Sequence, residues 1–513
     1  MPENIINRLK NRILPQWKIC FFAALSVGFF AHFYKITNWL PNWDSLVFRY
    51  DSQDMLSLGR WLLSAACALS SYYDLPWLNG ILAIVFHALG TVCICEIFDV
   101  KKGVTAALIG GVVITFPTVT SVMMYNYVAD GYAFAFLFSC IAALYLTREK
   151  YLIASVMITL SIAIYQAYIA VTVMLLLMYL TDELVFKKRE TLHLVKKGLK
   201  FLAAGAAGVI LYYAVMEILL KITGVEILEY QGMDTAAKFS GIDIANSLYV
   251  CVHKFIDSFF DFSKGLNVFV LLNCVILAIT AAAYLLSALV KKEFVTIGRI
   301  ILLVIYAVLL PAGAIVLVFI NYSIDYHNLM KMGDCVFYLL FILLYERMDF
   351  LNIKMRSIKS WTVLTLGVML IFNQSVIANV SYHKLQMSYE KSYGTLIRIA
   401  DRIEQTDNSE ICKKLLVIGA LPDSKAYSVN LPPDMTGTTD GYILRADDEI
   451  VGQSVLCSAI NDYCGKEYKF LSGTEKREML NKEEVKGMNF WPQKNSVAVV
   501  DDVIVVKLGA ESE

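Results

Sequence analysis

Long apolar segments separated by short polar ones run along most of the chain. A helix rises about 1.5 Å per residue, so about 20 apolar residues are enough to cross the hydrocarbon core of a membrane. The pattern predicts eleven spanning helices, several of them short: Trp17–Ile36, Asn79–Phe98, Val104–Met124, Gly131–Leu146, Tyr151–Gln166, Ala167–Leu180, Leu199–Leu220, Leu266–Val290, Ile300–Ile320, Cys335–Tyr345 and Trp361–Ser381. We therefore expect a mainly α-helical, multi-pass membrane protein.

Basic residues gather in every second loop of this arrangement. Examples are the cluster before the first span, Lys101-Lys102, Lys187-Lys188-Arg189 and the segment from Arg347 to Lys359. Cytoplasmic loops carry an excess of Lys and Arg, so the N-terminus is predicted to be cytoplasmic and the C-terminal region extracytoplasmic. The first apolar segment is long and no small-residue cleavage site follows it, so we interpret it as a retained anchor.

The apolar stretch from Tyr151 to Leu180 is too long for one straight span, and a single crossing would place the Lys187-Lys188-Arg189 cluster outside. We therefore predict a break at Tyr165-Gln166-Ala167-Tyr168, where polar groups can turn two short helices inside the protein. Tyr165 and Gln166 are candidate substrate contacts. A hydrogen bond between packed helices explains Gln166 equally well.

Two domains are predicted. Residues 1–384 form the membrane domain, with outer loops 37–78, 221–265 and 321–334, and residues 385–513 form a small soluble α/β domain outside the membrane. In the latter, Tyr389–Ile403 has a helical period, Leu415–Gly419 is typical of a strand, and Val497–Leu508 predicts two strands joined at Asp501-Asp502. Within the second outer loop, Ile242–Phe262 is amphipathic and is expected to lie on the membrane surface.

Composition narrows the function classes. Hydrophobic residues make up 58% of the chain. The 45 basic residues balance 45 acidic ones, so no excess of positive charge favours the binding of nucleic acid. Most of the cysteines lie in or near apolar segments and are expected to act as small hydrophobes, and Cys93-x-Cys95 is therefore not a metal site. Cys457 and Cys464 are candidates for a disulfide if their region is extracytoplasmic.

The polar residues that could take part in catalysis fall on the predicted outer side. The densest group follows the first span: Asn42-Trp43-Asp44, then Arg49-Tyr50-Asp51-Ser52-Gln53-Asp54, then Gly59-Arg60-Trp61. Charged residues packed beside a spanning helix need a reason, and chemistry at the bilayer surface is the leading one. Convergence on one side is what an extracytoplasmic active site requires.

Transfer of a sugar from a lipid phosphate to a hydroxyl needs a carboxylate that takes the acceptor proton and cations that stabilise the departing phosphate. Asp44 is the predicted base because it follows the first span directly, and Asp51 is the reserve. Trp43 is either an interface anchor or a ring on which the sugar stacks. Arg60 and Lys331, with Arg49 and His327 behind them, are candidates for the phosphate clamp. The apolar run from Arg60 to Leu69 predicts a helix along the interface.

Each assignment has a structural alternative. An acid in an outer loop is often a solvated residue or a helix cap, Arg60 can anchor a helix end at the headgroups, and His327 alone is typical of a hydrogen-bonded loop residue. Asp44, Asp51 and Asp54 lack the fixed spacing of a calcium loop. A divalent cation therefore stays open, with no metal ligand assigned.

The combination of Asn42-Trp43-Asp44, Gly59-Arg60-Trp61 and Ile164-Tyr165-Gln166-Ala167-Tyr168 resembles the bacterial type II glucosyltransferase family, GT-C membrane enzymes related to those that glucosylate O-antigen. The resemblance implies an inverting transfer of a hexose, typically glucose, from a polyprenyl-phosphate sugar to a cell-surface polysaccharide. It also implies that an aspartate of the first outer loop is the base, which carries over to Asp44 and more weakly to Asp51. A GT-C helix after the first span matches Arg60–Leu69.

Two other classes stay open from the residues. A transporter or flippase of a lipid-linked saccharide is expected to line its mid-membrane helices with charge, whereas these spans contain few polar groups such as Glu96, Glu217 and Gln166. A polysaccharide polymerase also has large outer loops but extends chains instead of decorating them. The expected partners in the main hypothesis are a lipid-linked sugar donor, a polysaccharide acceptor and membrane lipids.

Overall fold

The computed structural model describes residues 13–187, 189–228, 244–260, 268–289, 296–321, 324, 326–348, 352–421 and 452–510. The chain divides into two compact units. The membrane unit contains Met1–Asn38 and Asp51–Asn379, and the C-terminal unit contains Trp39–Tyr50 and Val380–Glu513. The loop that follows the first span is thus shared between the two units, which the sequence did not indicate.

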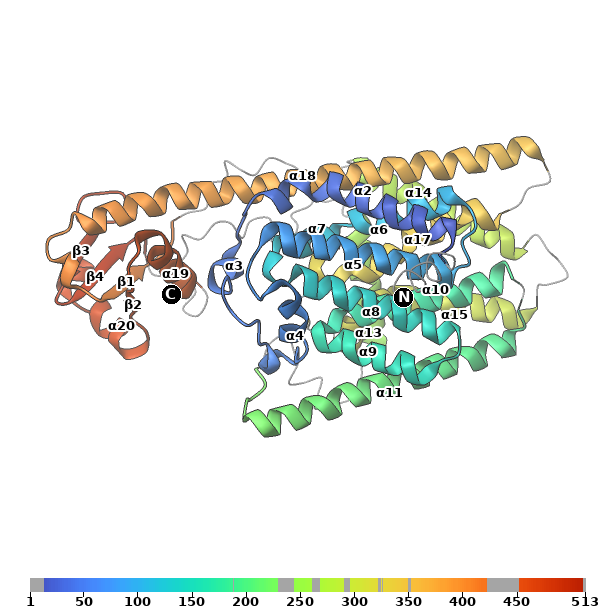
Figure 1. The fold of residues 1–513 in the computed structure, drawn as a ribbon, viewed down its shortest axis with the longest axis horizontal. Coiled ribbons are helices and arrows are strands. Elements are labelled where there is room, and N and C mark those ends of the chain that lie inside the picture. Colours follow the sequence, from blue (N-terminus) through green and yellow to red (C-terminus); the bar gives the residue numbers. More distant parts are fainter. Residues whose placement is uncertain are drawn as a thin grey trace, which may run out of the picture. The chain divides into compact units, whose positions relative to one another are not determined.

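The membrane unit is built from long apolar helices (Figure 1). Among the described residues, nine are long and apolar enough to cross a membrane, or ten if one bent pair is a single span. The prediction of eleven spans is not confirmed, because α9 (Tyr151–Ile164) is apolar but has only 14 residues. The nine are α2 (Pro15–Thr37), α5 (Pro76–Ile97), η3–α8 (Asn126–Thr147), η4–α10 (Gln166–Val185), α11 (Thr191–Thr223), α14 (Val268–Leu289), α15 (Ile297–Ala314), η7–α17 (Asn328–Arg347) and α18 (Ile353–Glu404).

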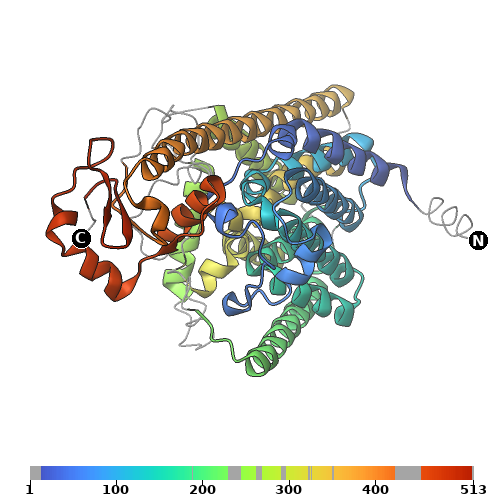
Figure 2. The same ribbon diagram turned by 60° about the vertical axis from the view of Figure 1, so that its left-hand side comes forward.

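Neighbouring helices of this unit pack in chain order. Helix α2 lies against α5 and α6 (Gly103–Thr115), α5 lies against α8, and α9 lies between α8 and α11 (Figures 1 and 2). Small residues allow close approach: a Cβ atom on Gly110 of α6 would lie 2.5 Å from the carbonyl oxygen of Cys20 in α2. Such contacts replace the hydrophobic effect as the force that joins helices in lipid.

Two spans are interrupted. Helix α6 meets α7 (Pro117–Met124) at a bend of 42° because proline cannot continue the first helix. The break predicted near Tyr165 is confirmed, since α9 ends at Ile164 and a short 3-10 helix, η4 (Gln166–Tyr168), precedes α10 (Ile169–Val185). The backbone freed by this break is satisfied inside the protein, where the Ser139 hydroxyl donates to the Tyr168 carbonyl at 2.8 Å.

Two local predictions need correction. The run from Arg60 to Leu69 is not one helix but a short α4 (Leu63–Cys67) followed by the 3-10 turn η2 (Ala68–Ser70). The segment expected as a separate helix at Tyr389–Ile403 is the end of α18, which is continuous over 52 residues. A helix satisfies its own backbone hydrogen bonds along its length, so a change of side-chain polarity near Ser381 does not end it.

The amphipathic stretch in the second loop forms α13 (Ile244–Phe260), which packs against α14, α15 and α16 (Val316–Ile320). Its place on the membrane surface stays a prediction. The α17 helix (Cys335–Arg347) is almost wholly buried between its neighbours, in agreement with a central position in the unit.

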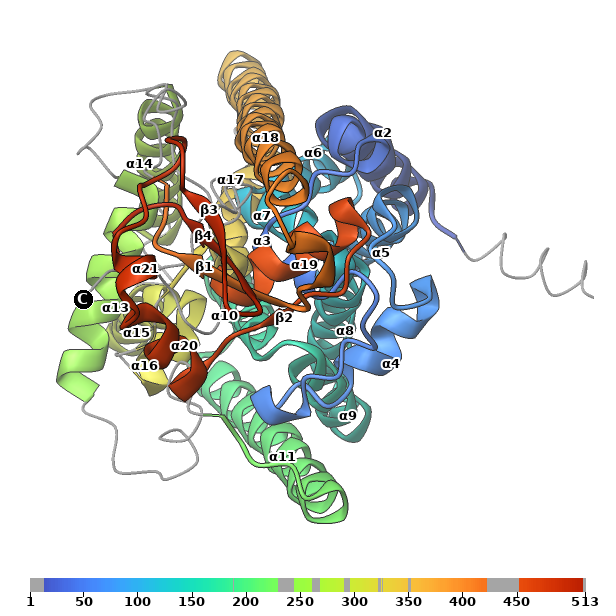
Figure 3. The ribbon, with the colours of Figure 1, turned by 90° about the vertical axis from the view of Figure 1, so that its left-hand side faces the viewer.

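The C-terminal unit contains the expected strands. They are β1 (Lys414–Ile418), β2 (Lys469–Phe470), β3 (Val497–Val500) and β4 (Val503–Lys507), in the order β2-β1-β4-β3. Strand β1 is parallel to β2 and β4, whereas β3 and β4 form the antiparallel pair predicted around Asp501-Asp502 (Figure 3). Helices α19 (Gly452–Cys464), α20 (Gly473–Leu480) and α21 (Glu483–Lys486) complete this unit.

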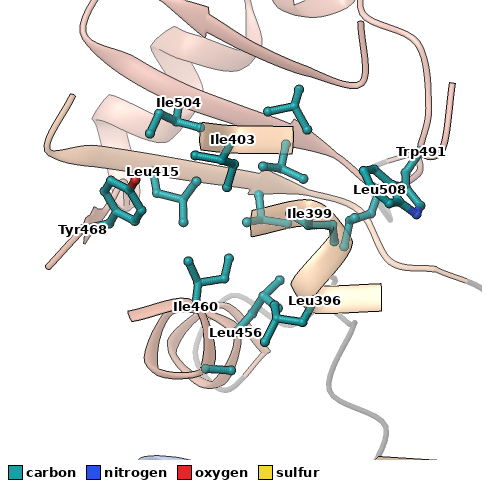
Figure 4. Packing of buried hydrophobic residues seen from close by; sticks show 14 of the residues in the cluster. Leu396, Ile399, Ile403, Leu415, Leu456, Ile460, Tyr468, Trp491, Ile504 and Leu508 are labelled. Carbon is teal, nitrogen blue, oxygen red and sulfur yellow. The ribbon is translucent and has the colours of Figure 1, made fainter. Parts of the chain in front are cut away.

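One core of this unit lies between the sheet, the end of α18 and α19 (Figure 4). Leu396 and Ile399 of α18 meet Leu415 of β1, Ile504 of β4 and Leu456 of α19. Leu46, from the short segment after the first span, is 2% exposed and belongs to the same cluster. Burial of a leucine side chain contributes roughly 1.5–3 kcal/mol, so this contact holds the segment in the unit.

Candidate functional site

Asp44, the predicted base, lies in the C-terminal unit. It stands in the first turn of α3 (Trp43–Val47), whose N-cap is Asn42: the Asn42 Oδ1 accepts a hydrogen bond from the Ser45 amide at 2.8 Å. Such a cap favours a helix start at this point. The Asp44 side chain is partly exposed, while Leu46 points into the core. The side chain of Trp43 falls outside the described residues.

Arg49 is held by groups of the same unit. Its Nη1 lies 3.4 Å from the Asp462 Oδ2 of α19, and its guanidinium carbon is 3.8 Å from the centre of the Trp39 ring. Trp39 in turn meets the Tyr389 ring edge-on at 5.9 Å, and the hydroxyl groups of Tyr389 and Tyr463 are hydrogen-bonded. Burial raises the pKa of the Tyr463 hydroxyl, so this group stays neutral at physiological pH.

Asp51 and Asp54 stabilise turns in the part of the loop that belongs to the membrane unit, which resumes at Asp51. The Asp51 Oδ1 accepts from the Gln53 amide at 3.3 Å, and the Asp54 Oδ1 accepts from the Leu56 amide at 3.2 Å. Gln53 is buried with a positive φ of 57°, and its amide nitrogen donates to the Tyr72 carbonyl. Both carboxylates are exposed and stabilise local backbone, as aspartates in turns commonly do. Asp51 therefore has a structural role as a hydrogen-bond acceptor in this turn.

Arg60 is fixed by aromatic residues of the membrane unit. Its Nη1 donates to the Tyr132 hydroxyl at 3.0 Å, and its guanidinium carbon lies 4.8 Å from the centre of the Tyr165 ring. The rings of Tyr132 and Tyr165 are stacked at 4.4 Å with an interplanar angle of 9°. Neither tyrosine carries a charge, so these contacts orient the cation without neutralising it.

The backbone around Arg60 is tied to the broken span. Met55 and Arg60 form an antiparallel bridge closed by Gly59 with φ of 72°, a conformation that glycine adopts without strain. The Leu62 amide donates to the Ala163 carbonyl at 3.0 Å. Tyr165 was predicted as a substrate contact. Its ring lies next to the Arg60 guanidinium, and its contact with a substrate stays a prediction.

Gln166 makes hydrogen bonds to the same loop. Its Nε2 donates to the Leu58 carbonyl at 2.9 Å and lies 3.3 Å from the Tyr212 hydroxyl, which itself donates to the Gly59 carbonyl at 2.8 Å. The prediction left open a packing hydrogen bond or a substrate contact. These bonds show that Gln166 makes packing hydrogen bonds and positions the loop that carries Arg60. Its contact with a substrate stays a prediction.

A buried polar network lies next to this loop. Asn126 donates to the Asp74 carboxylate at 2.6 Å, and Asn79 bonds Ser70 at 3.2 Å and the Asp130 carboxylate at 3.3 Å. Lys35, at the end of α2, is 1% exposed and interacts electrostatically with Asp74. Charged groups buried at a span end need such partners. Their scatter over four segments leaves no local pattern in the sequence.

Lys331 and His327 lie at a third place in the membrane unit. Lys331 is on the 3-10 helix η7 (Asn328–Asp334), which packs against α7, η4 and α10. It interacts electrostatically with Asp334, which is 2% exposed, and its Nζ lies 5.4 Å from the centre of the Tyr326 ring. His327 is the N-cap residue of η7 and is partly buried. Asp325, a neighbour in the sequence, falls outside the described residues.

The predicted site residues thus fall into two groups. In the membrane unit, Arg60 lies over the Tyr165 ring and Gln166 bonds the Leu58 carbonyl of the same loop. The 3-10 helix η7, with Lys331, packs against the 3-10 helix that contains Gln166. Asp44 and Arg49 belong to the C-terminal unit. In the part of the chain that is described, no group of three His, Cys, Asp or Glu side chains is arranged to hold a metal ion. The side chains of Cys457 and Cys464 lie outside the described residues.

The comparison with protein families decides the class. A family model described as glucosyl transferase GtrII matches residues 33–345, which is more than half of the chain and includes each candidate from Asp44 to Lys331. The chain belongs to this glucosyltransferase family. It is therefore a glycosyltransferase with sugar donor and acceptor substrates, embedded in a membrane by its long apolar helices. The resemblance drawn from the sequence motifs is confirmed.

No curated protein and no solved structure matches the chain. The family match ends within α17, so α18 and the sheet of the C-terminal unit lie beyond it. The short segment Trp39–Tyr50, which packs in that unit, lies inside it.

Proposed function

We propose that this glucosyltransferase moves glucose from a polyprenyl-phosphate donor to a polysaccharide on the extracytoplasmic side of the membrane, with inversion at the anomeric carbon. The observation that carries the proposal is the family match over residues 33–345, which includes the whole acidic and basic loop after the first span. A membrane-embedded glucosyltransferase has direct access to a donor that is itself a lipid.

Asp44 is the proposed base. Its carboxylate takes the proton of an acceptor hydroxyl while the hydroxyl oxygen attacks the anomeric carbon of the glucose. The bond between that carbon and the phosphate oxygen breaks, and polyprenyl phosphate leaves with the bonding electron pair. Asp44 is partly exposed at the start of a capped helix, a position from which a polymer hydroxyl can be reached.

Arg60 is the proposed partner of the leaving phosphate. Its guanidinium is oriented by Tyr132 and Tyr165, two neutral side chains, so it can offer charge and planar donors to phosphate oxygens. Preorganised cations of this kind stabilise charge that develops in the transition state. Lys331 and His327 are proposed to support the same phosphate, and the C-terminal unit is proposed to bind the acceptor polymer.

The experiment is to incubate the purified enzyme in proteoliposomes with a panel of polyprenyl-phosphate sugars and, separately, with a nucleotide-linked glucose. We expect consumption of polyprenyl-phosphate glucose and single glucose branches on the polysaccharide, measured by mass analysis. Consumption of the nucleotide sugar instead, or long homopolymer products, would refute the assignment. Movement of the lipid across the bilayer without a covalent product would favour a flippase. Parallel reactions with a chelator decide whether a divalent cation takes part.

A further inference from the structure

The segment that bears the proposed base is built into the C-terminal unit instead of the helices that carry the family's spans. Helix α3 packs against α19, and Leu46 enters the core formed by Leu456, Ala459 and Ile460 of that helix. A helix of five residues is far too short to be stable alone. Its position, and with it the direction of the Asp44 side chain, therefore depends on the contacts made at its two ends.

Arg49 supplies the polar contact just after the end of α3. It contacts Asp462 of α19 and the face of Trp39. Arg49 follows α3 and Trp39 precedes it, so these contacts connect the chain on both sides of α3 with α19. Trp39 is fixed in turn by the Tyr389 ring of α18. The chain on both sides of α3 thus contacts α18 and α19, and Leu46, within α3, adds an apolar contact to the same core.

We propose that Arg49 and Asp462 are positioning residues of the transfer reaction: they hold α3 on the C-terminal unit so that Asp44 stays in the geometry for proton abstraction. The inference rests on the proposed function, in which Asp44 is the base. It gives Arg49 a role different from the phosphate clamp suggested by its charge, because its guanidinium is already engaged by a carboxylate and an indole ring. It also gives the C-terminal unit a part in the transfer reaction.

The contact is expected to act on geometry more than on folding. The Arg49 and Asp462 side chains keep 18% and 36% of their surfaces exposed, and ion pairs of such exposure contribute little to stability. A displacement of a catalytic group by about 1 Å, however, can lower the rate about 100-fold. Loss of the pair is therefore expected to lower kcat while the binding of the donor is kept.

The test compares Arg49→Ala with a matched arginine of the same unit. Arg402 also stacks on a tryptophan, with its guanidinium carbon 4.8 Å from the Trp491 ring, and donates to the Pro492 and Gln493 carbonyls, but it does not belong to the Asp44 segment. We expect Arg49→Ala to lower kcat about 10-fold to 100-fold with the donor KM unchanged within about twofold. Arg402→Ala should keep kcat near that of the wild type.

A charge exchange gives a second, independent readout. Arg49→Asp and Asp462→Arg should each lower kcat, because each places like charges together, and the double variant should recover at least about tenfold of the loss. Equal kcat values for Arg49→Ala and Arg402→Ala, an increase in the donor KM for Arg49→Ala, or no recovery in the double variant would overturn the proposal. The assays use whichever glucosyl donor the wild type consumes, so a wrong donor assignment is seen separately, in the wild type alone.

Discussion

Arg49 and Arg60 belong to the same loop, yet the protein uses them in two different settings. Arg49 lies in the C-terminal unit, where the Asp462 carboxylate and the Trp39 ring hold it. Arg60 lies in the membrane unit, where a tyrosine hydroxyl and a tyrosine ring orient it. In the first setting a carboxylate pairs with the arginine, and in the second two tyrosines orient it. Under the proposed function, one loop supplies both a structural cation, Arg49, and a substrate-binding cation, Arg60.

The acids of the loop divide in the same way. Asp51 and Asp54 bond to backbone amides of their own turns, whereas Asp44 stands on a capped helix whose amide contact is made by Asn42. Substitutions at these residues test the division.

The largest effect is expected from Asp44→Asn. The amide cannot accept the acceptor proton, so glucose transfer should fall about 10³-fold, in the range that general bases contribute. Rates of transfer from polyprenyl-phosphate glucose measure this, and donor binding should be kept. Asp54→Asn is the matched control, because asparagine keeps an oxygen for the Leu56 amide. Unchanged transfer by Asp44→Asn would move the base elsewhere in the chain.

Leu46→Ala tests whether α3 depends on the C-terminal core. Deleting the buried part of this side chain, which is 2% exposed, should lower the free energy of unfolding of that unit by about 2–4 kcal/mol. Urea titration in detergent, with trypsin cleavage of the unit as the signal, measures the change. Val47→Ala is the control from the same helix, since Val47 is 38% exposed and should have a small effect. Equal midpoints for the two variants would mean that α3 is not part of this core.

Arg60→Ala should remove the cation proposed for the leaving phosphate. We expect kcat/KM for the donor to fall about 100-fold, the order seen when one donor to a developing anion is lost. Arg60→Lys keeps the charge but not the planar fork, so it should recover only part of the loss. A kcat/KM for Arg60→Ala within about twofold of the wild type would show that Arg60 only anchors the loop.

Tyr132→Phe is the mildest change. It removes the hydroxyl that accepts from Arg60 and keeps the ring that stacks on Tyr165. A hydrogen bond to a charged group contributes about 1.5 kcal/mol or more, so kcat/KM should fall about tenfold. The measurement is the same donor titration. A decrease as large as that of Arg60→Ala would indicate that the hydroxyl itself contacts the substrate.

Hydropathy and local pattern predicted much of the fold. The nine spanning helices found among the described residues follow from signals within a few neighbouring residues. The break at Tyr165-Gln166 and the strand pair around Asp501-Asp502 follow from such local signals too. The eleventh predicted span is not confirmed, because α9 is apolar but has only 14 residues. The continuity of α18 was missed since a change in polarity was interpreted as a helix end.

The candidate site was predictable only in part. The sequence indicated Arg60, Tyr165 and Gln166 separately, and the structure brings them together at one loop. The pairing of Arg49 with Asp462, and that of Asn126 with Asp74, joins segments far apart in the chain, and such pairs leave no periodic signal. Tyr132 and Tyr212 were missed because tyrosines inside apolar helices look like ordinary packing residues.

Labelling of introduced cysteines tests on which side of the membrane the transfer takes place. Tyr50 is 68% exposed and follows the Asp44 helix, and Lys101 lies in a loop predicted to be cytoplasmic. A membrane-impermeant maleimide should label Tyr50→Cys in intact cells and Lys101→Cys only after permeabilisation, with the wild type as background. Labelling of Tyr50→Cys only after permeabilisation would place Asp44 in the cytoplasm and contradict extracytoplasmic glucose transfer.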